Sequence, residues 1–206
     1  AFRYLLMSHG IFSIGFFAFG GWYPVSLIRT YGMSYTELGI FAGTVLGITM
    51  LVASVASGYF CPAVARRTGN ERWMAILPAI FCLISVVAMV VASMDLSKPV
   101  VMVAGAIAFF FVVARTPPIL GLSIELLPAS IRSLATVVFI IVTNVIGSAV
   151  GPIIVGMVSD SATASLGEGP ALRQAMLMTV PLFGLAGALL AFVPARYIPR
   201  KLASRA

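Results

Sequence analysis

A single arginine stands in the middle of an otherwise apolar stretch of the sequence, FFFVVARTPPILG at residues 109–121. A guanidinium group stays charged and can hold a carboxylate or a phosphate through two hydrogen bonds. If the apolar segment around it crosses a membrane, Arg115 lies about 22 Å from the outer end of that segment near Val100, counted at 1.5 Å per residue. A cation at that depth costs about 3 kcal/mol on insertion scales and above about 10 kcal/mol in simulations. The sequence therefore predicts a partner for Arg115.

Three explanations of Arg115 remain open. The side chain can extend toward cytoplasmic headgroups along Pro118 and Leu122. It can line a cavity and meet the anionic head of a substrate, or a carboxylate from another segment. It can also pair with backbone carbonyls. Our hypothesis is that Arg115 recognises the charged group of an anionic substrate.

Other polar residues share faces of apolar helices. His9 and Ser13 are one turn apart, and so are Asn144 and Ser148. His9 can relay a proton, donate to a substrate, or form packing hydrogen bonds. Asn144 and Ser148 can bind substrate or tie their helix to a neighbour. The expected substrate-binding residues are Arg115, Thr116, Asn144, Ser148, His9 and Ser13.

The sequence offers nothing typical of an enzyme. It has one histidine, no carboxylate pair inside an apolar stretch, no metal-ligand cluster and no phosphate-binding loop. Cys61 and Cys82 form neither a disulfide framework nor a metal spacing, so we expect small buried residues there. We therefore expect no enzymatic activity, no cofactor and no metal.

The composition predicts an all-α polytopic membrane protein. Of the 206 residues, 61% are apolar and 9% are charged, whereas about a quarter of the residues in a soluble domain are charged. Alternating patterns suited to a barrel are absent, so the spans must be helices. We expect one bundle of six transmembrane helices at residues 4–28, 36–61, 73–94, 100–122, 133–158 and 173–194.

The basic residues predict the orientation of these spans. One side carries Arg3, Arg66, Arg67, Arg72, Arg132, Arg196, Arg200, Lys201 and Arg205, and the other side carries Arg29, Lys98 and Arg173. The positive-inside rule makes the first side cytoplasmic, with both termini there. The net charge of +7 is then a signal of topology, and no nucleic-acid partner is expected.

The spans differ in polarity in a three-plus-three pattern. The third and sixth spans are almost wholly apolar, and the others carry serine, threonine, histidine, asparagine or arginine. Polar groups turn toward the bundle interior or a wet cavity. We therefore expect two inverted three-helix repeats, with the third and sixth spans outside, facing lipid. No residue-level repeat supports this symmetry at this stage.

Small residues at four-residue spacing predict close helix contacts. The second span contains Gly39, Gly43 and Gly47, and the fifth contains Gly147 and Gly151, followed by Pro152. We expect these residues to pack against neighbouring helices more than to contact a ligand.

Five stretches resemble a known family when taken in order. They are GGWYPVSLIRTYGMS, SGYFCPAVARRTGNERW, ELLPASIRSLA, NVIGSAVGPIIVGMVSD and GEGPALRQAM. Together they resemble the C-terminal six-helix half of a spinster-like member of the major facilitator superfamily. The second stretch sits where that family carries G-x-x-x-D-R-x-x-R-R, but here Pro62 and Ala63 replace its acid and first arginine. In that family the loop locks the cytoplasmic face through charge pairs and helix-end contacts. This departure implies that the lock is weaker here, or that the arginines hold it against partners elsewhere.

The resemblance implies half of a secondary active transporter that works by alternating access on an amphiphilic or organic anion, such as a lysolipid, whose charged group Arg115 would recognise. It implies a cytoplasmic gate at Gly58, Arg66, Arg67, Arg72 and Arg132. It also implies an N-terminal six-helix partner half, in the same chain or a separate one, that holds the acids for proton coupling. The chain starts at Ala1 directly before a span, so we expect a fragment of a longer protein.

Membrane lipids are the remaining expected partner, and a bacterial inner membrane is the expected location. Two alternatives stay open. A facilitator for aromatic acids or similar organic anions has a closely similar fifth-span motif. A membrane scaffold module that does not transport is the alternative from a different class.

Overall fold

The structure is a computed structural model that describes residues 2–198, and its regular secondary structure is entirely helical in that range. Arg200, Lys201 and Arg205, assigned above to the cytoplasmic side, lie outside the described residues. The helices are α1 (Phe2–Tyr31), α2 (Tyr35–Ile40), α3 (Gly47–Thr68), α4 (Trp73–Ala92), α5 (Lys98–Ala114), α6 (Thr116–Glu125), α7 (Arg132–Ile141), α8 (Gly147–Leu166) and α9 (Glu168–Leu190). Two π-helical turns, η1 (Phe41–Leu46) and η3 (Val142–Ile146), and two 3₁₀ turns, η2 (Ala129–Ile131) and η4 (Pro194–Arg196), complete them.

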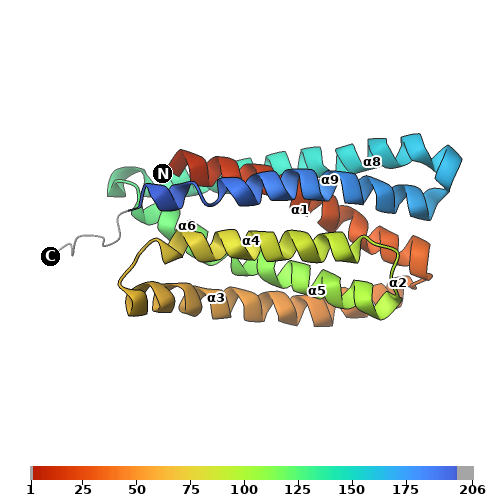
Figure 1. Cartoon of the computed structure of the whole chain (residues 1–206), viewed down its shortest axis with the longest axis horizontal. Helices are drawn as coiled ribbons and strands as arrows, with labels where there is room; N and C mark the ends of the chain where they lie inside the picture. Colours follow the sequence, from red (N-terminus) through yellow and green to blue (C-terminus); the bar gives the residue numbers. More distant parts are fainter. Residues whose placement is uncertain (1, 199–206) are drawn as a thin grey trace.

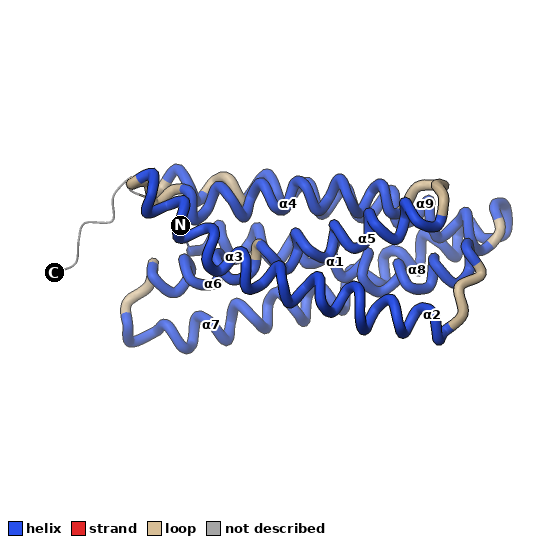
Figure 2. Tube along the Cα trace, turned by 90° about the horizontal axis from the view of Figure 1, so that it is seen from below, coloured by secondary structure: helices blue, strands red, loops and turns tan. Residues whose placement is uncertain are grey.

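These helices join into six segments long and apolar enough to cross a membrane. The segments are Phe2–Tyr31, Tyr35–Thr68, Trp73–Ala92, Lys98–Glu125, Ala129–Leu166 and Glu168–Arg196, which confirms the predicted number and order of spans. The segments lie side by side along the long axis, and the two ends of the described chain lie at the same end of the bundle (Figures 1 and 2). The chain is thus a multi-pass membrane protein.

Within the described residues, the third and sixth spans are more buried than the second and fifth, and their expected place on the outside, facing lipid, stays a prediction. In the most apolar window of each span, 50% of residues are buried in α4 and 39% in α9, but only 17% in α2–α3 and 22% in α7–α8. The helices α4 and α9 contact each other, and α9 also contacts α1 and α8. The low polarity of the third and sixth spans therefore reflects burial between helices as well as contact with lipid.

The crossing of α1 and α9 is held by glycines. A Cβ atom added at Gly15 would lie 3.0 Å from the nitrogen of Gly184, and one added at Gly187 would lie 2.6 Å from the nitrogen of Phe12. Ser8 donates a hydrogen bond of 2.9 Å to the carbonyl of Gly187. Because association within a membrane depends on close backbone approach, these glycines set the distance between the two helices.

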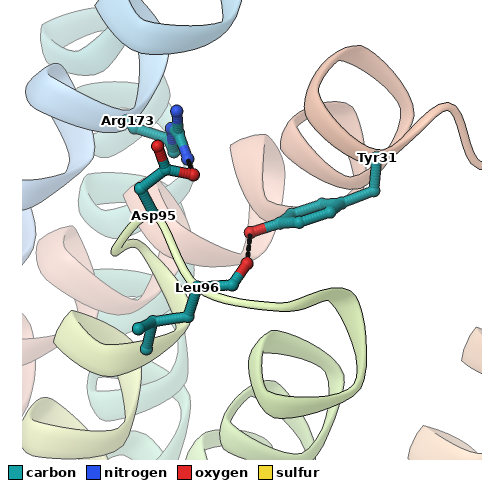
Figure 3. Close-up of polar contacts among 4 residues, drawn as sticks. All are labelled: Tyr31, Asp95, Leu96 and Arg173. Atoms are coloured by element: carbon teal, nitrogen blue, oxygen red, sulfur yellow. Dashed lines mark hydrogen bonds and ion pairs between the residues drawn. The ribbon is translucent and has the colours of Figure 1, made fainter.

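Polar contacts join three segments at the end of the bundle opposite the chain ends. Asp95, in the α4–α5 loop, pairs with Arg173 of α9, and Tyr31 donates a 2.7 Å hydrogen bond to the carbonyl of Leu96 (Figure 3). Arg29 lies 3.5 Å from Glu168 in a second ion pair. These contacts connect the end of α1, the α4–α5 loop and the start of α9.

Candidate functional site

The fourth span is broken at Arg115. Helix α5 ends at Ala114 and α6 begins at Thr116, so Arg115 stands at the junction. Pro117 and Pro118 follow in the first turn of α6 and have no backbone N–H to donate to the preceding turn. The prolines therefore explain the break. Arg115 lies at this break, between α5 and α6.

Within residues 2–198, Arg115 is buried without a negatively charged partner. Its side chain is 2% exposed, and one guanidinium nitrogen lies 3.6 Å from the sulfur of Cys82. The guanidinium carbon lies 3.8 Å from the centre of the Phe12 ring, a cation–π contact. Its Nε has no hydrogen-bond partner in residues 2–198, and both ion pairs found there involve other arginines.

These contacts bear on the three explanations of Arg115. The burial of the side chain contradicts extension toward headgroups. Among the described residues, no backbone carbonyl accepts a hydrogen bond from the guanidinium group either. Lining a cavity is the explanation that remains.

A cavity of about 180 Å³ opens beside Arg115. Five of the six expected substrate-binding residues line it together: His9, Ser13, Arg115, Thr116 and Asn144. Its other walls are mainly apolar and come from α1, α5, α6, α7 and η3, with the residues Phe16, Phe17, Val112, Leu120, Phe139, Ile140 and Thr143. The first, fourth and fifth spans therefore form the cavity, without the second span that we expected beside them.

His9 is a buried donor or acceptor next to this cavity. Its side chain is 7% exposed, its ring lies 4.7 Å from that of Phe139, and its Nδ1 has no hydrogen-bond partner in the described range. The nearby Ser13 hydroxyl donates a 2.6 Å hydrogen bond to the carbonyl of Gly10. Within the described chain, His9 is therefore not fixed by a hydrogen bond at Nδ1.

The other candidates differ in their positions. Thr116 and Asn144 each donate to a carbonyl one turn earlier, Val112 at 3.3 Å and Ile140 at 2.9 Å. With its amide nitrogen used in this way, Asn144 keeps its amide oxygen as an acceptor beside the cavity. Ser148 is exposed and does not line the cavity.

The glycines of the second and fifth spans differ in how closely neighbouring helices approach them. A Cβ atom at Gly147 would lie 2.6 Å from Phe17, and one at Gly151 would lie 2.7 Å from the nitrogen of Ala18, so α8 approaches α1 closely. The carbonyl of Pro152 accepts a 2.9 Å hydrogen bond from Trp22.

Gly39 and Gly43 have no described atom within 4 Å of such a Cβ, and Gly47 has only a carbonyl of its own span, at 3.8 Å. Close packing of the second-span glycines is therefore not found within the described residues.

The expected gate residues lie at the end of the bundle that carries the chain ends. Arg66 and Arg67 are exposed, as is Gly58 on the same helix. The Nε atoms of Arg72 and Arg132 donate 3.0 Å hydrogen bonds to the carbonyls of Ile198 and Leu127. Neither ion pair of the described chain lies at this end.

The sequence did not reveal several contributors to the site. Phe12 and Cys82 contact Arg115 from α1 and α4, and Phe139 and Thr143 line the cavity. Phe12 lies three residues after His9, so helical spacing placed it near that face. Cys82 is distant in sequence and carries no such signal.

The cavity is small for an organic ligand, since binding pockets usually measure about 300–1,000 Å³. No group of three or more metal-ligating side chains is found in residues 2–198. The described chain thus presents a partial cavity with one cation, a histidine, four further polar side chains and apolar walls.

No family model matches the sequence. The sequence is 30% identical over 166 residues to an MFS-type efflux pump of Mycolicibacterium smegmatis (strain ATCC 700084 / mc(2)155), across 81% of this chain and 38% of that protein.

Two crystal structures of a bacterial homologue of the human lysosomal transporter Spinster are similar in fold. The inward-facing, occupied conformation matches with a TM-score of 0.79 and 19% identity, over 96% of this chain and 49% of that one. The unoccupied conformation matches with a TM-score of 0.77 and 20% identity, over 95% and 47%. The chain thus spans about half the length of these solved relatives.

Proposed function

The chain belongs to the major facilitator superfamily, and from this premise we propose that it is one half of a secondary active transporter for an amphiphilic or organic anion. Its relatives are transport proteins, so the chain is not an enzyme. In this proposal a second six-helix half, in the same chain or another, completes the cavity. The two halves then rock about the midplane to expose the cavity to each side in turn.

The observation that carries the proposal is the buried charge of Arg115, which no acidic side chain compensates among the residues that the structure describes. A buried cation without a carboxylate partner is costly, and an anion in the adjoining cavity would offset that cost. The aromatic and aliphatic walls suit an apolar tail beside the charged head. Within the site, Arg115 binds the anion, and Thr116, Asn144, His9 and Ser13 contact polar atoms near it. Ser148 would reach a substrate only through the second half.

Several finer features belong to the same proposal. The end with Arg66, Arg67, Arg72 and Arg132 faces the cytoplasm of a bacterial inner membrane, where these arginines and Gly58 meet the second half as a gate. Because Arg66 and Arg67 are exposed, they are available to carboxylates of that half. Coupling to a proton would use acids of that half, since none of the six acids of this chain lies at the cavity.

Transport in proteoliposomes tests the proposal with two probes that share an octyl tail and carry opposite charges. Purified full-length transporter would be reconstituted, and uptake of octyl phosphate and octyltrimethylammonium would be compared. The unaltered protein should move the phosphate in preference to the cation. Arg115→Ala and Arg115→Lys should each reduce phosphate uptake at least about tenfold, the effect of losing about 1.4 kcal/mol of binding. Arg3→Lys, an exposed arginine away from the cavity, is the matched control and should transport normally.

The same experiment separates the alternatives. Uptake of benzoate in place of octyl phosphate, still dependent on Arg115, would favour the facilitator for aromatic acids. Equal phosphate uptake by the unaltered protein and both Arg115 variants would contradict the role of Arg115. No uptake of any probe by a correctly inserted protein would favour the scaffold module.

A further inference from the structure

A short sequence repeat occurs in the second and fifth spans. Residues 40–47 read IFAGTVLG and residues 140–147 read IIVTNVIG. Both begin with isoleucine, carry a threonine or asparagine at the fifth position and a valine at the sixth, and end with glycine. The two spans hold corresponding places in their three-helix groups, so the repeat relates the two groups.

Each copy of the repeat contains a π-helical turn. The turn η1 covers Phe41–Leu46 and η3 covers Val142–Ile146, and each is followed directly by the glycine that begins the long helix, Gly47 or Gly147. The N–H of Gly47 donates to the carbonyl of Ala42, five residues earlier. Single π turns are rare within helices and occur often at functional sites.

The fifth residue of each copy makes the same contact. Thr44 donates its hydroxyl to the carbonyl of Ile40 at 2.5 Å, and Asn144 donates its amide to the carbonyl of Ile140 at 2.9 Å. In both cases a side chain donates a hydrogen bond to the carbonyl four residues earlier, where the wider turn changes the regular pattern of backbone hydrogen bonds. Such side-chain bonds to the preceding turn often bend a helix.

The two turns lie toward opposite ends of the molecule. Counted at about 1.5 Å per residue, η1 begins about 9 Å from the start of the second span at Tyr35. The turn η3 begins about 15 Å from the start of α7 at Arg132. Since the two spans run in opposite directions, one turn lies nearer each face of the membrane. Each connects a short terminal helix, α2 or α7, to a long one.

Both turns contact the elements that carry the cavity. The turn η3 contacts α1 and supplies the cavity residues Thr143 and Asn144. The turn η1 contacts α5, the helix that ends at Ala114, directly before Arg115. Bending at either turn therefore moves a short helix next to an element of the binding site.

We propose that η1 and η3 are a matched pair of bending points, at which α2 and α7 swing to close opposite ends of the transport pathway. This inference rests on the alternating access in the proposed function. Conversion between a π turn and an α turn changes the direction of the chain beyond it, while Thr44 and Asn144 keep the Ile40 and Ile140 carbonyls satisfied. The glycines permit the change because they add no side chain at the junction.

Deletion of one residue tests the proposal, because a π turn shortened by one residue becomes regular α-helix while its flanks keep their faces. Val45 and Val145 would be deleted separately in the full transporter, which carries spin labels in place of Tyr35 and Ser97, or of Ser133 and Arg3. These exposed pairs report the positions of α2 and α7. Distances would be measured without any substrate by pulsed electron paramagnetic resonance.

The unaltered transporter should show two distances for each pair. Deletion of Val45 should leave one distance for the Tyr35–Ser97 pair, and deletion of Val145 should leave one for the Ser133–Arg3 pair. Two distances in unchanged proportions in both deletions would overturn the inference. A single distance for each pair in the unaltered transporter would also overturn the inference, because rocking of rigid halves leaves distances within this half unchanged. Uptake of octyl phosphate by the same protein would then show that the proposed function still stands, and absence of that uptake would identify the failure as that of the proposed function.

Substitutions at Thr44, which does not line the cavity, keep the test decisive if a deletion prevents folding. Thr44→Val removes the hydroxyl and nearly preserves the shape, whereas Thr44→Ser and Thr44→Asn keep a donor for the Ile40 carbonyl. Thr44→Val should shift the ratio of the two Tyr35–Ser97 distances at least about threefold, and the other two variants should keep it near the unaltered value. Equal ratios in all three variants would count against the proposal.

Discussion

At the scale of the residue, Arg115 is buried, and the described part of the chain places no compensating charge beside it. Its contacts are a thiol and an aromatic ring, both weaker partners for a guanidinium group than a carboxylate. The residue type and its position in the span were readable from the sequence. Its contact with Cys82 was not, because the two are 33 residues apart and belong to different helices.

We expect the buried charge of a binding arginine to lower the stability of the folded protein. We predict that Arg115→Met, which keeps much of the side-chain volume but removes the charge, leaves the thermal unfolding temperature unchanged or raises it. Replacement of a buried charge by an apolar group is often neutral or stabilising by about 1–4 kcal/mol. Thermal unfolding of the purified transporter measures this, with Arg3→Met as the control at an exposed arginine. A clearly lowered unfolding temperature would indicate a structural role instead.

At the scale of the element, helix contacts depend on which small residues meet a backbone. Gly147 and Gly151 do so in the described chain, whereas Gly39 and Gly43 do not. Sequence spacing could not distinguish them, since the same spacing suits a face toward this chain and a face toward a second half. Gly15, Gly184 and Gly187 make the tight crossing of α1 and α9 and form no regular four-residue series.

Substitution at this crossing should be costly. In Gly187→Ala the new Cβ would lie 2.6 Å from the nitrogen of Phe12, so the helices must separate. We predict destabilisation of about 1–3 kcal/mol, as for overpacking of a close contact. Gly121→Ala is the matched control, because nothing described lies within 4 Å of its Cβ, and it should be neutral or slightly stabilising. Similar unfolding temperatures for the two variants would argue against the close α1–α9 contact.

The loop contact at the opposite end predicts a pH dependence. The hydrogen bond and charge of Arg173 lower the pKa of Asp95. A lowered folded-state pKa contributes stability above the unfolded pKa of about 3.9, and this contribution is lost as pH falls through the folded value. Asp95→Asn should therefore lower the unfolding temperature slightly at neutral pH, since Asp95 is exposed, and the difference should shrink as pH falls below about 3.9.

Thermal unfolding between pH 7 and pH 3 measures this effect. Asp160→Asn is the control, because Asp160 is exposed and takes part in neither ion pair of the described chain. A difference between the unaltered protein and Asp95→Asn that persists unchanged at low pH would contradict the assigned ion pair.

At the scale of the whole molecule, the chain has large apolar surfaces on its second and fifth spans. Exposed side chains there include Leu51 at 65%, Leu134 at 65% and Met157 at 69%. We propose that lipid and a second half cover them. Composition predicted the membrane class and the six spans, because both follow from the distribution of apolar residues. It could not give the order of burial, because an apolar residue suits lipid and a helix interface equally well.

The repeat at residues 40–47 and 140–147 is a second feature that was not predicted from the sequence. Sequence comparison alone did not reveal it, because its shared positions are few and chemically ordinary. The common π turn and the common bonds to the Ile40 and Ile140 carbonyls make the correspondence recognisable. The symmetry of the half is therefore clearer in the backbone than in the residues.

Equilibrium binding tests the central claim most directly. Binding of octyl phosphate and of octyltrimethylammonium to the full transporter in nanodiscs would be compared with binding to Arg115→Met. Our account predicts that the unaltered protein prefers the phosphate and that Arg115→Met weakens phosphate binding at least about tenfold, or about 1.4 kcal/mol, without weakening binding of the cation. Equal affinity of the two proteins for octyl phosphate would contradict it.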